Sequence, residues 1–298
     1  GSALHLAKRE RGCPYRFYQQ SNYEEAVNQI TLEPELLNAL RQEQFVLHYQ
    51  PRIDLNTRRI VGVEALIRWQ HPQKGLLYPD TFIPMAEKSG LIVPMGYWVF
   101  NKALEDIKLL DAQGCKLSKI GINLSFRQFQ DDTLVPTIAR LLERSGIHPG
   151  RVEFELTETS VALNEQHVSL CITDLNTLGV TFSLDDFGTG YSSFAHLQKL
   201  PISTLKLDRS FVQGVTDNPD DAEIVRAIIN LAHNLRKDVV AEGAETAEQV
   251  AFLERNECDQ VQGYYFSKPV SLPQLFKQLK AQRTPQTEQQ PSIQSARL

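Results

Sequence analysis

The sequence contains few of the residues that mark zinc sites, disulfide-rich folds or membrane spans. No two cysteines form a CxxC pair, and none has the Cys and His spacing of a zinc site: Cys13, Cys115, Cys171 and Cys258. We therefore expect unpaired thiols in a reducing compartment, which favours a cytoplasmic location. No apolar run reaches about 18 residues and no signal peptide precedes the first periodic segment, so we expect no membrane contact by this chain. The leading Gly1-Ser2 resembles a cloning scar, which leaves open a longer, membrane-anchored natural protein.

Excess positive charge is also missing. The 298 residues carry a formal net charge of -5, with 42% hydrophobic and 22% charged residues. This balance disfavours DNA or RNA polymers as partners, so a phosphate-bearing substrate would need local cations. The length and composition fit one soluble domain of roughly 250 residues with a single large core.

Eight short β-rich segments alternate with amphipathic stretches along the chain. The β-rich segments are 45–53, 60–69, 119–125, 151–158, 180–188, 204–208, 238–245 and 259–266. Helical patterns occupy 134–144, 167–178, 221–235 and 247–255, among others. Strands that alternate with helices indicate parallel βαβ units, and this number of strands favours a (β/α)8 barrel.

The start of this α/β barrel is expected to be irregular. Only LNTRR separates the first two β-rich segments, which is too short for a crossover helix. These strands should therefore pair antiparallel, which gives a modified TIM barrel with an antiparallel first strand. A helical insertion from Pro79 to Gly114 is expected before the third strand. A doubly wound sheet is the alternative, but no GxGxxG follows the first strand to support it.

Polar residues recur near the carboxyl ends of these segments. They are Glu64, Asn123, Glu155, Glu158, Asp185, Asp186, Lys206, Asp208, Glu242, Glu245 and Gln262. In a barrel these ends meet at one mouth, where active sites form. The set contains oxygen ligands but no histidine or thiol, which suits Mg2+ or Mn2+.

The segment TFSLDDFGTG places two carboxylates, Asp185 and Asp186, side by side before two glycines. Successive strand residues point to opposite faces, so the two can share a target only where the strand ends and turns. A pair of divalent cations would neutralise them and would activate water for attack at phosphorus. A single Mg2+ that stabilises an enolate is an alternative at this point.

Ten motifs occur in one order along residues 33–279. They are YQP (49–51), EALIRW (64–69), HP (71–72), FIPMAE (82–87), NLS (123–125), ELTE (155–158), DDFGTGYSSF (185–194), KLDRSF (206–211), AEGAE (241–245) and QGYYFSKP (262–269). With these motifs the chain resembles the EAL-domain phosphodiesterases, which open cyclic di-GMP to linear pGpG. The resemblance implies this hydrolase activity, with two divalent cations, Mg2+ or Mn2+, as cofactors.

The resemblance also implies a role for each matching residue. The ligands of the first metal would be Glu64, Asn123, Glu155 and Asp185, and those of the second Asp185, Asp186 and Glu242. Lys206 and Asp208 would orient the attacking water, with Glu242 or Lys206 handling protons. Glu158 would anchor the DDFGTG loop, and Glu245 and Gln262 would support the site, with Gln262 also at the substrate. Arg68 would contact phosphate, and the alternative is that it only pairs with an acid on the barrel rim. Gln50 would contact guanine, and the alternative is that it only hydrogen-bonds to backbone groups.

Domain limits and partners follow from the same resemblance. Residues 1–22 resemble the end of an upstream GGDEF domain, residues 23–281 the EAL domain, and residues 282–298 are expected to be a disordered tail. The resemblance implies a homodimer contact through the DDFGTG-loop region and upstream GGDEF or sensor domains. A catalytically silent receptor for cyclic di-GMP is one alternative, and an unrelated barrel lyase or isomerase is another. The departures at Ile67 and Ala244 exchange apolar residues, and because no expected ligand is missing, catalysis is favoured.

Overall fold

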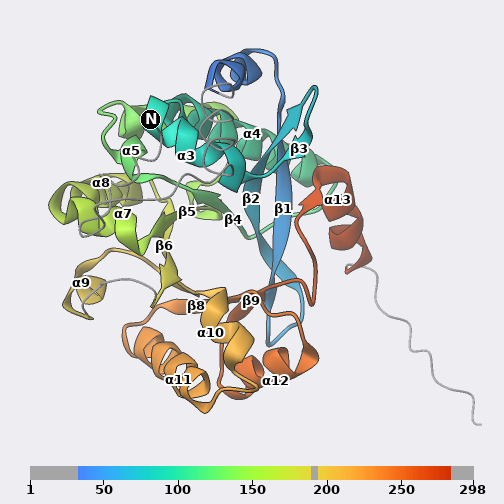
Figure 1. Cartoon of the computed structure of the whole chain (residues 1–298), viewed down its shortest axis with the longest axis vertical. Helices are drawn as coiled ribbons and strands as arrows, with labels where there is room; N and C mark the ends of the chain where they lie inside the picture. The colour runs from blue at the N-terminus through green and yellow to red at the C-terminus, as the bar shows by residue number, and fades with distance from the viewer. Residues whose placement is uncertain (1–32, 189–193, 283–298) are drawn as a thin grey trace, which may run out of the picture.

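A closed ring of eight strands lies at the centre of the computed structural model, which describes residues 33–188 and 194–282 (Figure 1). The strands of the ring are β1 (Phe45–Asp54), β2 (Ile60–His71), β4 (Lys119–Asn123), β5 (Val152–Thr157), β6 (Thr181–Phe187), β7 (Thr204–Leu207), β8 (Asp238–Glu242) and β9 (Gln260–Gln262). The ring closes because β1 pairs with both β2 and β9. The predicted α/β barrel is therefore confirmed.

The first strand runs against the rest of the barrel. β1 is antiparallel to β2 and β9, whereas each neighbouring pair from β2 through β4 to β9 is parallel. The turn after β1 is tight because Asp54 Oδ1 accepts hydrogen bonds from the backbone and hydroxyl of Thr57, both at 2.7 Å. Arg58 then adopts a φ of 57°. The antiparallel first strand expected from the short LNTRR connection is thus present.

Helices surround the ring, with α3, α4 and α5 on one side and α10, α11 and α12 on the opposite side (Figure 1). Residues 33–41 are helical. The other helices are α3 (Pro79–Ser89), α4 (Ile92–Ala112), α5 (Phe126–Phe129), α6 (Leu134–Ser145), η1 (Pro149–Arg151), α7 (Glu158–Leu163), α8 (Glu165–Thr177), α9 (Phe194–Lys199), α10 (Arg209–Gly214), α11 (Pro219–Asn234), α12 (Ala247–Arg255) and α13 (Leu272–Ala281). The helical insertion expected between the second and third strands of the ring consists of α3 and α4. None of the helices in the described ranges has the length and apolar character needed to cross a bilayer.

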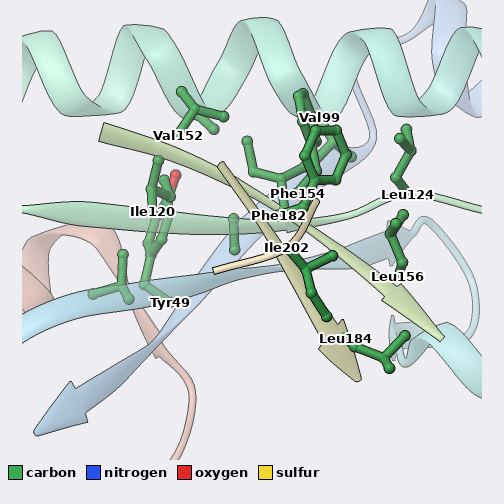
Figure 2. Close-up of a cluster of buried hydrophobic side chains, with 14 of the residues drawn as sticks. Tyr49, Val99, Ile120, Leu124, Val152, Phe154, Leu156, Phe182, Leu184 and Ile202 are labelled. Atoms are coloured by element: carbon green, nitrogen blue, oxygen red, sulfur yellow. The ribbon is translucent and has the colours of Figure 1, made fainter. Parts of the chain in front are cut away.

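The main apolar core lies between the strands and the helices. Figure 2 shows Val99 of α4 above Phe154 and Phe182, which come from the neighbouring strands β5 and β6. The ring of Phe154 lies 5.5 Å from that of Phe100 and 5.6 Å from that of Phe182. Alternate residues of each strand face outward into this core, so the residues between them face the inside of the barrel.

The sequence did not indicate several short elements. Strand β3 (Gly75–Leu77) extends the sheet beside β2, and β10 (Val270–Ser271) lies beside β1. The last β-rich segment was expected to reach residue 266, but its strand ends at Gln262. Residues 1–22 and the tail from 283 onward fall outside the described residues. Gln282 is described, and its side chain hydrogen-bonds to the backbone of Ile60 at the start of β2.

Candidate active site

Four carboxylates surround one buried lysine at the carboxyl ends of the barrel strands. Lys206 of β7 is only 1% exposed. Its Nζ lies 2.7 Å from Glu242 Oε1, 3.1 Å from Asp185 Oδ2 and 3.6 Å from Glu64 Oε2. It also forms an ion pair with Glu155. The structure therefore brings together acids from four strands that lie far apart in the sequence.

Two amides hold Glu64 from either side. Asn123 Nδ2 donates to Glu64 Oε1 at 2.7 Å, and Gln262 Nε2 donates to Glu64 Oε2 at 2.5 Å. In the strand register Asn123 is level with Glu155 and Gln262 with Glu242, whereas Glu64 is level with Gly121. Each amide therefore shares a layer at the mouth with an acid of the adjacent strand.

The backbone turns where the two neighbouring aspartates stand. The register between β6 and β7 shifts between Leu184 and Phe187, and Asp186 has a φ of 54°. This left-handed conformation is unfavourable for most residues, but aspartate tolerates it comparatively well. The Asp186 N–H donates to Asp185 Oδ1 at 2.9 Å. Strand β6 continues to Phe187, so the strand does not end at the aspartates as expected, but the backbone does leave regular strand geometry at Asp186. Burial, followed by repulsion from Asp185, raises the pKa of Asp186.

The electrostatics of the cluster are those of crowded, buried acids. Burial, followed by repulsion from Glu64, raises the pKa of Glu155 to about 8. Burial is also the main reason why the pKa of Glu242 rises to about 7. Attraction to Lys206 and Arg52 outweighs the burial of Glu64 and lowers its pKa. The surrounding carboxylates likewise outweigh burial at Lys206 and raise its pKa well above its usual value.

The donor chemistry of this cluster fits a hard divalent cation. Carboxylate and amide oxygens predominate, and one ammonium faces four carboxylates, so negative charge is in excess. The carboxylates are turned toward Lys206. As they stand, no group of three or more His, Cys, Asp or Glu side chains among the described residues is arranged to hold an ion. Glu64, Asn123, Glu155, Asp185, Asp186 and Glu242 are the residues that would hold one.

Arg68 differs from an ordinary rim arginine. It is 5% exposed, and its Nη1 donates to the carbonyl of Ile67 at 2.8 Å. Its guanidinium lies 5.0 Å from the ring centroid of Tyr78. Its Nε has no hydrogen-bond partner, and it forms no ion pair with any described carboxylate. Burial lowers the pKa of Arg68, and the charges of Glu64 and Asp80 are among those that oppose this shift, so both interpretations of Arg68 stay predictions.

Gln50 is bound within the protein. Its Oε1 accepts from Gln262 Nε2 at 3.2 Å, and its Nε2 is 3.4 Å from the carbonyl oxygen of Ser267. It also lines a cavity of 210 Å³ beside Glu64 and Glu242. Gln50 therefore both hydrogen-bonds to the backbone and lines the smaller cavity.

A larger cavity of 440 Å³ lies on the other side of the carboxylates. Asn123 and Glu155 line it together with residues of α3 and α4. Leu66 lines both cavities. Glu155 therefore borders the larger cavity and Glu64 and Glu242 the smaller one.

Three other expected site residues have local roles in the structure. Asp208 caps α10, because its Oδ1 accepts from the backbone N–H of Ser210 at 2.9 Å and from the Ser210 hydroxyl. Glu158 is buried at the start of α7. Glu245 is exposed and lines the smaller cavity. The loop residues 189–193 fall outside the described ranges, so the anchoring of this loop by Glu158 stays a prediction.

The structure adds two charged residues that the sequence did not single out. Arg52 and Glu153 face the barrel interior below the cluster, and each is 2% exposed. Arg52 Nη1 is 2.5 Å from Glu153 Oε2, and Arg52 also pairs with Glu155. The sequence could have indicated both residues. Arg52 lies two residues after Gln50, and Glu153 lies two before Glu155, so each pair shares one face of its strand.

Comparison with known proteins gives a family match over most of the chain. The EAL domain model matches residues 33–269. The cyclic di-GMP phosphodiesterase NbdA of Pseudomonas aeruginosa is 40% identical over 283 residues, which are 95% of this chain and 36% of that protein. The bifunctional diguanylate cyclase/cyclic di-GMP phosphodiesterase MucR of the same species is 41% identical over 276 residues, which are 92% of this chain and 40% of that protein.

Solved structures of similar proteins have the same fold. The PaMucR phosphodiesterase in complex with c-di-GMP superposes with a TM-score of 0.76 at 41% identity, over 81% of this chain and 99% of that one. The EAL enzyme Bd1971, bound to cAMP and cyclic-di-GMP, gives a TM-score of 0.80 at 36% identity, over 85% and 69% of the two chains. The chain spans well under half the length of the two curated relatives.

Proposed function

The chain belongs to the EAL domain family, and on that premise we propose that it is a phosphodiesterase that hydrolyses cyclic di-GMP to linear pGpG. Relatives named cyclic di-GMP phosphodiesterases support this substrate. Divalent-metal dependence in general accompanies the family. The finer proposal is that two ions, Mg2+ or Mn2+, are held by Glu64, Asn123, Glu155, Asp185, Asp186 and Glu242.

One observation carries the proposal: four carboxylates gather around Lys206, and of these Glu155 borders one cavity and Glu64 and Glu242 border another. Cyclic di-GMP has two purine bases on either side of a ring with two phosphodiesters. Such a ligand would place a base in each cavity and a phosphodiester over the acids. Arg68, which pairs with no described carboxylate, would bind a phosphate oxygen through its free Nε–H.

The proposed reaction balances as a simple hydrolysis. Hydroxide from water becomes bonded to phosphorus, the bond from phosphorus to the 3′ oxygen breaks, and that oxygen takes a proton. Divalent cations would supply the acidity of the water and the neutralisation of phosphate charge. Lys206 and Asp208 would orient the water, with Lys206 donating a hydrogen bond to it. Asp208 is near the expected ligands, because its charge is among those that raise the pKa of Asp186. Glu242, at 2.7 Å from Lys206, would accept the proton of the water.

Further domains, dimerisation and cellular location concern the whole protein. We propose that the natural protein carries GGDEF or sensor domains upstream and that the chain dimerises through the DDFGTG-loop region. The support is the match to MucR, whose name includes a diguanylate cyclase. A cytoplasmic location is proposed because the described cysteines Cys115, Cys171 and Cys258 are unpaired, which suits a reducing compartment.

The test is chromatographic detection of pGpG from purified protein and cyclic di-GMP. We expect product with Mg2+ or Mn2+ and none with EDTA. Glu64→Gln keeps the shape of the side chain but removes its charge, and it should lower turnover by at least about a hundredfold. Glu143→Gln on the exposed face of α6 is the matched control and should retain full turnover.

The outcomes separate the competing functions. A protein that binds cyclic di-GMP tightly but yields no pGpG with either metal would be a silent receptor, and the hydrolase proposal would be overturned. A protein that does not bind the nucleotide would favour an unrelated barrel lyase or isomerase.

A further inference from the structure

Arg52 is a fully buried arginine inside the barrel, one layer below the carboxylates. It is paired with Gly62 across the antiparallel β1–β2 ladder, whereas Gln50 is paired with Glu64. Because alternate residues of β1 share a face, Arg52 lies beneath Gln50 on the inner face. A buried guanidinium is costly unless its hydrogen bonds are satisfied, so its partners define its role.

Each part of the Arg52 guanidinium has a different partner. Nη1 is 2.5 Å from Glu153 Oε2, Nη2 pairs with Glu155, and Nε donates to Gln262 Oε1 at 3.3 Å. Glu153 is held from its other side by the Thr204 hydroxyl at 2.9 Å. One side chain thus connects β1 with β5 and β9 through the barrel interior, and it contacts Glu155 directly.

The contact with Gln262 also fixes the direction of an amide. Since Gln262 Oε1 accepts from Arg52, its Nε2 faces Glu64 and donates to Oε2 at 2.5 Å. A flipped Gln262 amide would place its oxygen against the Glu64 carboxylate and its NH2 group against the Arg52 N–H. Arg52 therefore orients Glu155 by direct contact and Glu64 through Gln262.

A glycine leaves the space for this arrangement. A Cβ atom at Gly121 of β4 would lie 1.7 Å from Glu155 Oε1 and 2.4 Å from Arg52 Nη2. Backbone geometry does not require glycine there, because Gly121 is not among the glycines with positive φ. The glycine is instead needed because the ion pair fills the volume that a side chain would take.

We propose that Arg52 is a positioning residue: it anchors Glu155 directly and Glu64 through Gln262, so that each carboxylate needs only to turn away from Lys206 to bind a divalent cation. This inference rests on the proposed function, because it assumes that these carboxylates are the ligands. Arg52 lies below the cluster and does not reach the substrate. Its loss should therefore weaken metal binding more than nucleotide binding.

The test measures Mn2+ affinity directly, by electron paramagnetic resonance of free Mn2+. Arg52→Lys keeps the charge but has one nitrogen in place of three, so it cannot bond Glu153, Glu155 and Gln262 together. We expect its Mn2+ dissociation constant to rise at least about tenfold. The Mn2+ concentration for half-maximal turnover should rise in parallel, and kcat at saturating Mn2+ should largely recover.

Arg151→Lys is the matched control. Arg151 forms a two-point ion pair with Asp111 at 2.6 and 3.0 Å and donates to the carbonyl of Leu117 at 2.9 Å, at the opposite end of β5. The substitution breaks the same kind of fork at a site away from the cluster. We expect an unchanged Mn2+ dissociation constant even if the melting temperature falls.

Gly121→Ala provides a second route if Arg52→Lys fails to fold. It intrudes on the Arg52–Glu155 pair while leaving every charge in place, and it should also weaken Mn2+ binding. Wild-type Mn2+ affinity in both folded variants would overturn the inference. A wild-type protein that binds Mn2+ but makes no pGpG would overturn the hydrolase proposal alone, and one that binds no Mn2+ would overturn the inference as well.

Discussion

Lys206 is the residue on which the charge balance of the cluster depends. Its ammonium contacts carboxylates from β2, β5, β6 and β8 and is 1% exposed. Removing one partner of a buried ionic cluster leaves the other charges uncompensated, which costs more than the pairs themselves contribute. The lysine and a divalent cation therefore serve the same electrostatic need.

We expect Lys206→Met to make the stability of the protein depend on metal. In EDTA the free energy of unfolding should fall by about 3–5 kcal/mol, because Glu64, Asp185 and Glu242 lose their ion-pair partner and, among the described residues, only Glu155 keeps one, Arg52. Mn2+ should restore more stability to this variant than to the wild type, as measured by urea unfolding with and without the ion. Lys237→Met is the control, since Lys237 bonds only carbonyl oxygens of Leu200 and Ile202 and should show no extra response to Mn2+.

Asp186 combines an unusual backbone with an expected ligand role, and two substitutions separate these properties. At its φ of 54°, asparagine is tolerated about as well as aspartate, whereas alanine is not. We expect Asp186→Asn to fold with near wild-type stability but to lose most pGpG formation. Asp186→Ala should lose both turnover and about 1 kcal/mol of stability. Wild-type turnover in Asp186→Asn would show that the charge is not needed.

The acids of the cluster and their partners Lys206, Asn123 and Gln262 could be found from the sequence, but the buried Arg52 and Glu153 were not. Glu64, Glu155 and Asp185 were expected at one mouth because each ends a β-rich segment. Arg52 was missed because an arginine near the end of an edge-like segment is usually exposed, and only barrel closure buries it. The capping role of Asp208 was missed because it depends on a short helix, α10, that the pattern did not reveal.

At the scale of elements, periodicity predicted what is long and regular. The strands of the ring and helices such as α6, α8, α11 and α12 lie close to their expected positions. Strand β3 has three residues and β10 two, and both form only because β2 and β1 offer free edges to pair with. Such elements depend on tertiary contacts, so no local pattern indicates them.

The contact between β1 and α4 includes a buried polar group whose contribution can be measured. Tyr49 donates to Asp106 Oδ2 at 2.5 Å, and Lys102 contacts the other oxygen at 2.7 Å. Tyr49→Phe keeps the ring but leaves the buried carboxylate short of a donor. We expect the free energy of unfolding to fall by about 1–3 kcal/mol in urea unfolding, with little change in kcat.

Tyr97→Phe on the same helix is the matched comparison. Its hydroxyl donates to Asp131 at 2.6 Å, but Asp131 lies near the surface, where water can replace the lost donor. The loss of stability should therefore be smaller than for Tyr49→Phe. Equal losses would mean that burial of Asp106 does not determine the cost.

At the scale of the whole molecule, the barrel has an apolar exterior under its helices and a polar interior. Arg52, Glu64, Glu153, Glu155 and Lys206 are all buried inside it. The sequence indicated the closed barrel from the number of strands and the short first connection. It did not indicate the interior, because which face of a strand points inward becomes definite only when the ring closes.

A barrel with excess negative charge inside its mouth should be stabilised by the ion it binds. A ligand that binds only the folded state adds about 2.7 kcal/mol at a hundredfold excess over its dissociation constant. For a domain of this size, that corresponds to a rise in melting temperature of about 5–10 °C. We expect Mn2+ to produce this rise in a thermal unfolding scan and EDTA to reverse it. Glu64→Gln should reduce the rise to about half or less, whereas Glu143→Gln should retain it in full. An equal rise in all three proteins would place the ion away from the cluster, because Glu64, unlike Glu143, contacts Asn123, Gln262 and Lys206 there.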